Sequence, residues 1–84
     1  MTAAPDNPAP ANDAAAAYAR RRGEIARLLD VLEMELAKHA QAFEADPRNW
    51  GRVGDLAAVR GTLVNAVVAI SGVDPEAIEG FLAE

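Results

Sequence analysis

The chain has 84 residues, which is enough for one small domain at most. It has no cysteine, so disulfide bonds and thiolate metal sites are excluded. Thirteen acidic residues against eight basic ones give a net charge of −5, which opposes non-specific binding to nucleic acid or to anionic lipid.

The first twelve residues, MTAAPDNPAPAN, contain three prolines and almost no large apolar side chains. Such a segment cannot bury enough surface to offset its ordering entropy, so we expect residues 1–12 to form a disordered tail. The longest apolar stretch, LVNAVVAI at residues 63–70, is far shorter than the roughly 20 residues of a bilayer span. No secretory signal is recognisable at the N-terminus. We therefore expect a cytoplasmic protein without a membrane partner.

A first helix is predicted over residues 13–45. Either Asn12 or Asp13 can cap it, and the alanine run that follows has the highest helix propensity. Its apolar residues recur with the helical period on one face, which contains Tyr18, Ile25, Leu29, Leu32, Leu36, His39, Ala40 and Phe43.

The stretch ADPRN ends this helix, because Pro47 lacks an N–H and forces Asp46 out of the helical region. A second helix is predicted over residues 50–71, with Asn49 as its N-cap and Gly72 as its C-terminal stop. Its apolar seam has the spacing of a helix that packs on another helix, and only Arg60 interrupts it.

A short third helix is predicted over residues 75–83. Asp74 can cap its first turn, and Pro75 suits the first helical position. Its apolar face consists of Ile78, Phe81 and Leu82, and its acidic residues include Glu79.

The predicted fold is all-α and forms a single small domain over residues 13–84. The first two helices form an antiparallel hairpin, because a short loop joins two amphipathic helices. The third helix docks on this hairpin near Tyr18, with its acidic residues facing the arginines at 20–22.

Trp50 is the single tryptophan and lies between the turn and the second helix. We interpret it as a cover on the end of the helical core, near Phe43. The alternative is an exposed anchor for a binding partner.

The sequence contains no catalytic motif of a dehydrogenase, P-loop protein or hydrolase. His39 lies one turn after Glu35, which is one arrangement for a general base, but no nucleophile and no second histidine accompanies it. We expect no enzyme activity, no small-molecule substrate, no cofactor and no metal site, and we interpret His39 as a structural residue.

Four arginines, at Arg20, Arg21, Arg22 and Arg27, form the one basic cluster of the chain. They could bind phosphates, which makes a small nucleic-acid-associated regulator the alternative function. Because three successive residues spread around a helix axis, we favour a solvated helix surface.

Apolar residues outside the two packing faces predict a partner surface. Val31 and Met34 lie on the flank and back of the first helix, and Val64 and Val68 widen the apolar surface of the second helix. Exposed surface of this kind is typical of a binding site for a protein partner. The alternative is that the third helix covers most of this surface and the protein stays monomeric. We expect a non-enzymatic interaction module, such as an adaptor, inhibitor or assembly subunit, that self-associates as a homodimer. Trp50 is the next candidate contact residue.

Overall fold

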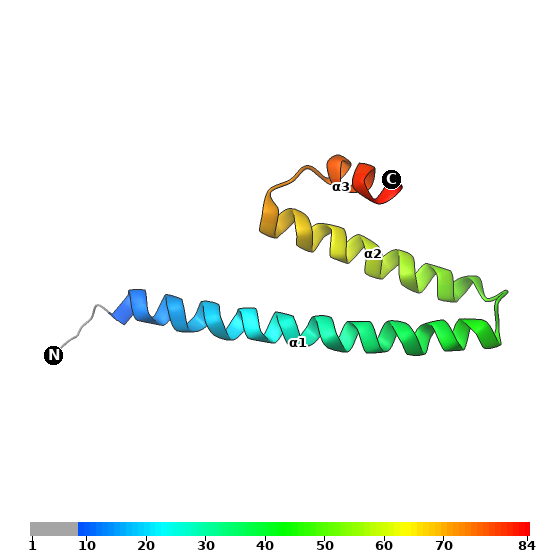
Figure 1. The fold of residues 1–84 in the computed structure, drawn as a ribbon, viewed down its shortest axis with the longest axis horizontal. Coiled ribbons are helices and arrows are strands. Elements are labelled where there is room, and N and C mark those ends of the chain that lie inside the picture. The colour runs from blue at the N-terminus through cyan, green and yellow to red at the C-terminus, as the bar shows by residue number, and fades with distance from the viewer. Residues whose placement is uncertain (1–8) are drawn as a thin grey trace. The chain divides into compact units, whose positions relative to one another are not determined.

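A computed structural model describes residues 9–84, with side chains described from Asp13 onward. Three helices make up this part of the chain, and it contains no strand: α1 (Ala9–Ala45), α2 (Trp50–Ser71) and α3 (Pro75–Ala83) (Figure 1). The prediction of an all-α fold is confirmed. The first eight residues of the predicted disordered tail lie outside the described residues.

Helix α1 begins at Ala9, earlier than the predicted start at residue 13, so Asn12 and Asp13 lie within the helix and do not cap it. Pro10 does not prevent this earlier start, because the first-turn N–H groups of a helix have no acceptor within the helix. With 37 residues, α1 is roughly 55 Å long.

The helix ends at Ala45, and a turn follows over residues 46–49, as predicted from Pro47. The Asp46 N–H donates to the Phe43 carbonyl at 2.9 Å, and the Asn49 N–H donates to the Asp46 carbonyl at 3.1 Å. The described residues divide into two compact units, with the boundary between Gln41 and Ala42. The antiparallel hairpin of the first two helices stays a prediction.

Helix α2 has the two ends that the sequence predicts. Asn49 has extended backbone, and its side-chain oxygen accepts a hydrogen bond from the Gly51 N–H at 2.9 Å. At the other end, Gly72 adopts a left-handed conformation with a φ of 73°, and its N–H donates to the Val68 carbonyl at 2.8 Å. Both caps satisfy backbone groups that a helix end leaves without partners.

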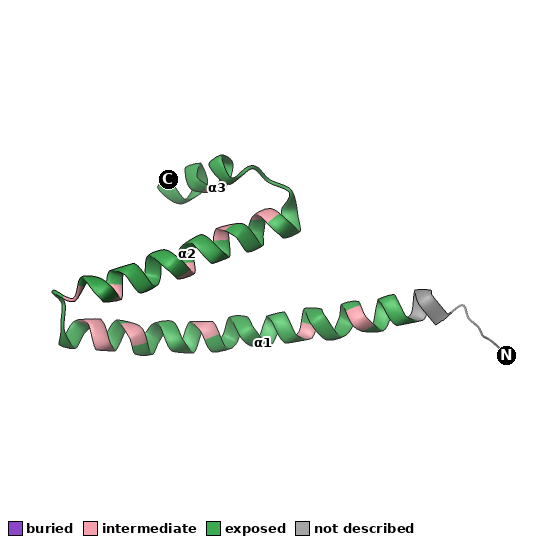
Figure 2. Cartoon of the chain, turned by 180° about the vertical axis from the view of Figure 1, so that it is seen from behind, coloured by how far each residue is buried: buried purple, intermediate pink, exposed green. Residues whose placement is uncertain are grey.

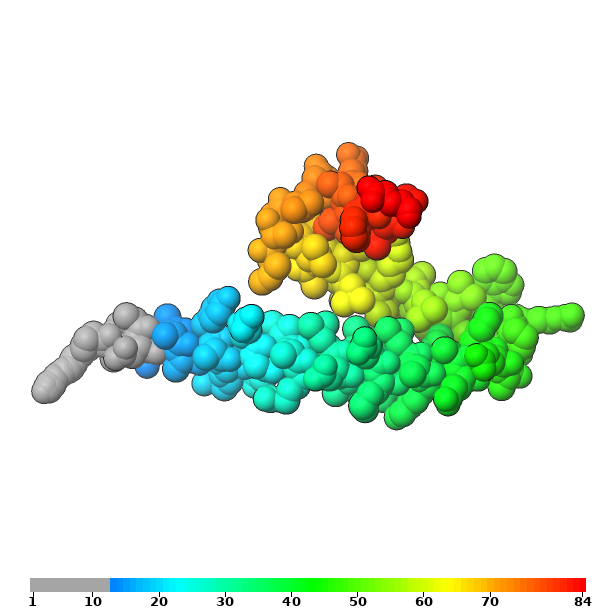
Figure 3. Space-filling model, in the orientation of Figure 1, coloured from blue at the N-terminus to red at the C-terminus, as the bar shows by residue number. Residues whose placement is uncertain are grey.

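Helix α3 begins where predicted, after Asp74, whose carboxylate accepts a hydrogen bond from the Glu76 N–H at 3.0 Å. It turns back along the C-terminal half of α2, and the two helices are in contact (Figures 1 and 3). This position corrects one prediction. Glu79 was predicted to face the arginines of the first helix, and it pairs with Arg60 of α2.

Candidate interaction surface

The described part of the chain exposes most of its large apolar side chains. No side chain in residues 13–84 is buried, and only a minority are half-buried (Figure 2). Six large apolar side chains are half-buried, namely Leu32, Phe43, Val59, Val64, Val68 and Ile78, whereas sixteen are exposed. A folded soluble monomer rarely leaves so much apolar surface open, so this surface is the candidate functional site.

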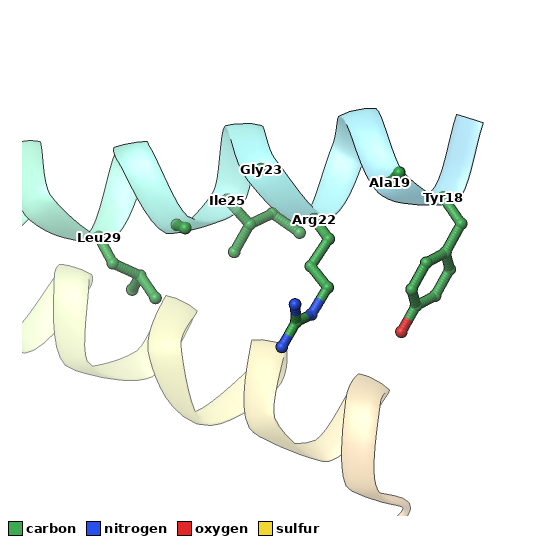
Figure 4. A pocket seen from close by; sticks show the side chains of 7 residues that line it. Tyr18, Ala19, Arg22, Gly23, Ile25 and Leu29 are labelled. Atoms are coloured by element: carbon green, nitrogen blue, oxygen red, sulfur yellow. The ribbon is translucent and has the colours of Figure 1, made fainter. Parts of the chain in front are cut away.

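The apolar face of α1 is open along its N-terminal half. Tyr18, Ile25 and Leu29 are exposed by 71%, 54% and 54%. Their side chains project from the same side of the helix as Arg22 (Figure 4). They form part of the lining of a surface depression whose lining residues are Tyr18, Ala19, Arg22, Gly23, Ile25, Ala26 and Leu29. The depression is mainly apolar, with one guanidinium among its lining groups.

Val31 and Met34, which we predicted as partner contacts, are both exposed on α1. A residue advances about 100° around a helix axis, so both lie well away from the face of Ile25 and Leu29. Helix α1 therefore carries apolar groups on two sides.

Val64 and Val68, the other predicted contacts, are half-buried. They follow Arg60 at steps of four residues and so lie in one row along α2. Since Arg60 bonds to Glu79 of α3, this row is the one that faces α3. Ile78, the neighbour of Glu79, is half-buried as well. Within residues 42–84, α3 thus shields part of the surface that we predicted for a partner.

The Arg60–Glu79 pair links α2 to α3 through two hydrogen bonds. The Arg60 guanidinium donates from Nη1 to Glu79 Oε2 at 3.0 Å and from Nη2 to Glu79 Oε1 at 2.7 Å. Such a bidentate arrangement fixes orientation more tightly than a single charge contact.

The same contact changes the pKa of both groups. The pKa of Glu79 lies below its ordinary value because Arg60 donates hydrogen bonds to the carboxylate; desolvation opposes this change and the positive charge of Arg60 adds to it. The pKa of Arg60 is raised, first by the hydrogen bonds to Glu79 and then by its negative charge. About half of each side chain is exposed, so the pair orients α3 more than it stabilises the fold.

Arg60 was predicted only as an interruption of an apolar seam, and its pairing with Glu79 was not predicted. The available signal was the acidic character of the third helix, which begins within a few residues of the end of α2. A charged residue in an apolar row needs a partner of opposite charge, and Glu79 is near enough to supply it.

Trp50 is the first residue of α2, and its side chain is 79% exposed. Our interpretation of Trp50 as a cover on the helical core is therefore wrong. The exposed ring fits the alternative, an anchor for a partner.

Arg20, Arg21, Arg22 and Arg27 are all exposed on α1. Arg22 lies with the apolar face that Figure 4 shows. The helical period places Arg20 and Arg27 on the opposite side. The four side chains therefore do not form a single phosphate-binding stripe.

His39 is half-buried, and the Glu35 carboxylate accepts a hydrogen bond from Lys38 Nζ at 3.2 Å. Within the described residues, no group of three or more histidine or acidic side chains is arranged to hold a metal ion.

By length and composition, α2 could cross a membrane. Its longest apolar run, at residues 63–70, is too short to span a bilayer, whereas the whole helix is apolar on average because it is rich in valine, alanine and leucine.

Comparison with known protein families, with characterised proteins and with solved structures gives no match.

Proposed function

We propose that this chain is a non-enzymatic helical interaction module that associates with a second copy of itself in the cytoplasm. The observation that carries the proposal is the exposure of large apolar side chains on all three helices, while no described side chain is buried. Small chains bury a low fraction of their surface even when they are compact. A chain that leaves its apolar side chains exposed gains little burial to offset the entropy of ordering.

Association supplies the missing burial. Removing a leucine, isoleucine or valine side chain fully from water contributes about 1.5–3 kcal/mol. Exposed residues such as Ile25, Leu29 and Met34 can make this contribution only against another molecule or another part of the chain. A symmetric pair of chains is the simplest arrangement that covers the same surface on both partners.

Within this proposal, Val31, Met34 and Trp50 are candidate contact residues, and the structure leaves each of them exposed. Val64 and Val68 remain candidates at their half-buried positions beside α3. An adaptor, an inhibitor and an assembly subunit would all use such a surface.

Sedimentation velocity from low to high micromolar concentration tests the proposal. We expect the mass to rise from one chain to two, and the melting temperature to rise with concentration because association stabilises the folded state. A single-chain mass over the whole range, with a melting temperature independent of concentration, would contradict self-association.

Membrane insertion is a second candidate, favoured by the length and composition of α2. Three charged residues oppose it. Helix α2 contains Arg52, Asp55 and Arg60, and Arg60 lies near its middle, where a charge is costly in a bilayer. Flotation with neutral phosphatidylcholine vesicles separates the two functions, since an interaction module stays in the dense fraction and an inserted helix floats with the lipid.

A further inference from the structure

One row of side chains on α2 is already covered by a helix. Arg60, Val64 and Val68 follow one another at steps of four residues, and α3 lies against the C-terminal half of α2, where this row runs (Figure 3). The two valines lie outside the seam that we predicted to face the first helix, so the predicted hairpin does not need them. The row is therefore a site for a further helix, and α3 shows which chemistry fits it.

The side of α3 that meets this row has a simple pattern. Ile78 is half-buried, and Glu79 beside it accepts two hydrogen bonds from Arg60. Leu82 follows Ile78 by one helical turn, so it lies on the same side of α3. The pattern consists of two apolar residues four positions apart, with a carboxylate directly after the first. A guanidinium binds a carboxylate in bidentate fashion, so the acidic residue belongs to the recognition pattern.

The contacts that hold α3 in this position are weak. It has nine residues, and an isolated helix of that length is not stable in water. Gly80 lies in its middle and lowers its helix propensity. Leu82 is 49% exposed, and the side chains of Arg60 and Glu79 are 52% and 51% exposed, so water reaches both the apolar contact and the charged pair. These features together make α3 a cover of low stability.

We infer that Arg60, Val64 and Val68 form a binding site for a short, acidic amphipathic helix of a partner protein, and that α3 occupies this site as an autoinhibitory helix. A partner helix with the same pattern places its carboxylate on Arg60 and its two apolar residues on the valines. Without a glycine in its middle, it is more helical before binding and loses less entropy on binding than α3. The inference goes beyond the proposed self-association and does not depend on it.

A second copy of the chain is a less suitable source of this helix. In every copy, residues 72–74 connect α3 to its own α2, and such a short connection gives an effective concentration in the millimolar range. The α3 of a second copy, at micromolar concentration, does not compete with the attached one. A partner helix overcomes the same attachment by higher affinity, which a longer sequence without glycine provides.

The stability of α3 on α2 sets the apparent affinity for the partner helix. Only chains with α3 detached bind that helix, so the apparent affinity falls with the fraction of such chains. A substitution that stabilises α3 must therefore weaken binding, even though it leaves the row on α2 unchanged. The same substitution in the ligand must strengthen binding.

The probe for this competition is a fluorescently labelled synthetic peptide of residues 72–84, and fluorescence anisotropy follows its binding to the full chain. Gly80→Ala in the peptide should tighten binding about fivefold, which corresponds to the gain in helix propensity. Gly80→Ala in the chain should weaken binding of the unaltered peptide by up to about fivefold, because its own α3 becomes the better competitor. The added Cβ meets no atom within 4 Å, so α3 can accept it without rearrangement.

Gly54→Ala in the chain is the matched control. It makes the same change in α2, outside the row and also in open space, and should leave the affinity for the peptide unchanged. Equal affinities of the Gly80→Ala, Gly54→Ala and unaltered chains would show that α3 does not compete with the peptide and would overturn the autoinhibition. Absence of binding by both peptides up to millimolar concentration would overturn the site itself.

Exchange of the charges locates the site. Arg60→Glu in the chain should abolish binding of the unaltered peptide, and Glu79→Arg in the peptide should restore it, because the pair then forms with the charges reversed. Circular dichroism checks that the altered chain keeps its helices. Loss of binding without restoration by the exchanged peptide would place the peptide elsewhere and contradict the assignment of the row.

A final mixture separates a partner protein from a second copy as the source of the helix. Unlabelled Arg60→Gln chain retains α3 but has an impaired row, and it is added to the complex of labelled peptide and unaltered chain. We expect no displacement, because the α3 of the added chain stays attached to its own α2. Displacement of the peptide would make α3 of a second copy the occupant and overturn the assignment to a partner protein.

Discussion

Single residues at the helix ends determine where α2 begins and stops. Among the described glycines, Gly72 alone has a positive φ, at 73°, which is the left-handed conformation. Its N–H donates to the Val68 carbonyl at the end of the helix. Other residues reach this conformation only with strain, because their Cβ approaches the backbone. The end of α2, and with it the direction in which the chain leaves toward α3, therefore depends on this glycine.

Replacing Gly72 by alanine is expected to lower the stability of the folded chain by roughly 1–2 kcal/mol, which is the cost of the left-handed conformation for a residue with a Cβ. Gly61→Ala is the control, because Gly61 lies inside α2 with open space where a Cβ would be added. That variant should gain up to about 1 kcal/mol from higher helix propensity. Thermal unfolding followed by circular dichroism measures both, and equal effects of the two substitutions would exclude a special role for Gly72.

Asn49 has the corresponding role at the start of α2. Asn49→Ala removes the side-chain oxygen that accepts the Gly51 N–H, so we expect a loss of about 0.5–2 kcal/mol. Asn49→Asp keeps an oxygen at that position and should retain most of the stability. Urea unfolding at constant protein concentration compares the three proteins, and the cap would be unimportant if alanine and aspartate behaved alike.

Among the elements, α3 depends most on a neighbour. It has nine residues, too few for an isolated helix to be stable in water. Its position on α2 combines the burial of Ile78 with the bidentate contact between Glu79 and Arg60. The apolar contact holds α3 on α2, and the charged pair fixes its orientation.

The lowered pKa of Glu79 predicts how α3 responds to acid. A carboxylate whose pKa is lower in the folded state contributes stability above its ordinary pKa, and that contribution is lost as the pH falls through the lowered value. After correction for intrinsic rates, amide hydrogen exchange in α3 should therefore become faster as the pH falls through the lowered pKa of Glu79. In Glu79→Gln the exchange should be faster already at neutral pH, with a weaker further response to acid.

Glu84→Gln removes the same charge from the C-terminal cap position of α3, outside the pair, and should keep the behaviour of the unaltered chain. A Glu79→Gln variant with unchanged exchange at neutral pH would show that the apolar contact orients α3 without the charged pair.

At the scale of the whole molecule, the proposed self-association would cover exposed apolar surface, and the fluorescence of Trp50 offers a direct signal of it. It is the single tryptophan, and its ring is 79% exposed. If Trp50 is a contact residue, its fluorescence emission should shift to shorter wavelength as protein concentration rises and water is excluded from the ring. A doubled mass without any shift in emission would place Trp50 outside the interface.

Several features of this protein were determined by the sequence alone. Pro47 ends the first helix, and Asn49, Gly72, Asp74 and Pro75 place the remaining helix ends at the residues where the structure has them. These signals act over one helical turn, through a missing N–H, a side-chain acceptor or a permitted φ, so neighbouring residues suffice to interpret them. The start of α1 was predicted too late, because asparagine and aspartate are good caps but are also tolerated inside an alanine-rich helix.

The pairing of Arg60 with Glu79 and the exposure of Trp50 were decided by the tertiary structure. Arg60 was expected to interrupt a packing seam, and Glu79 was expected to face the arginines of α1, because periodicity shows which face of a helix a residue occupies but not which element approaches that face. Trp50 was expected to cover a core, but its exposure depends on where the rest of the chain lies around it. The pair of Arg60 and Glu79 joins residues distant in sequence, and local patterns do not specify such a contact.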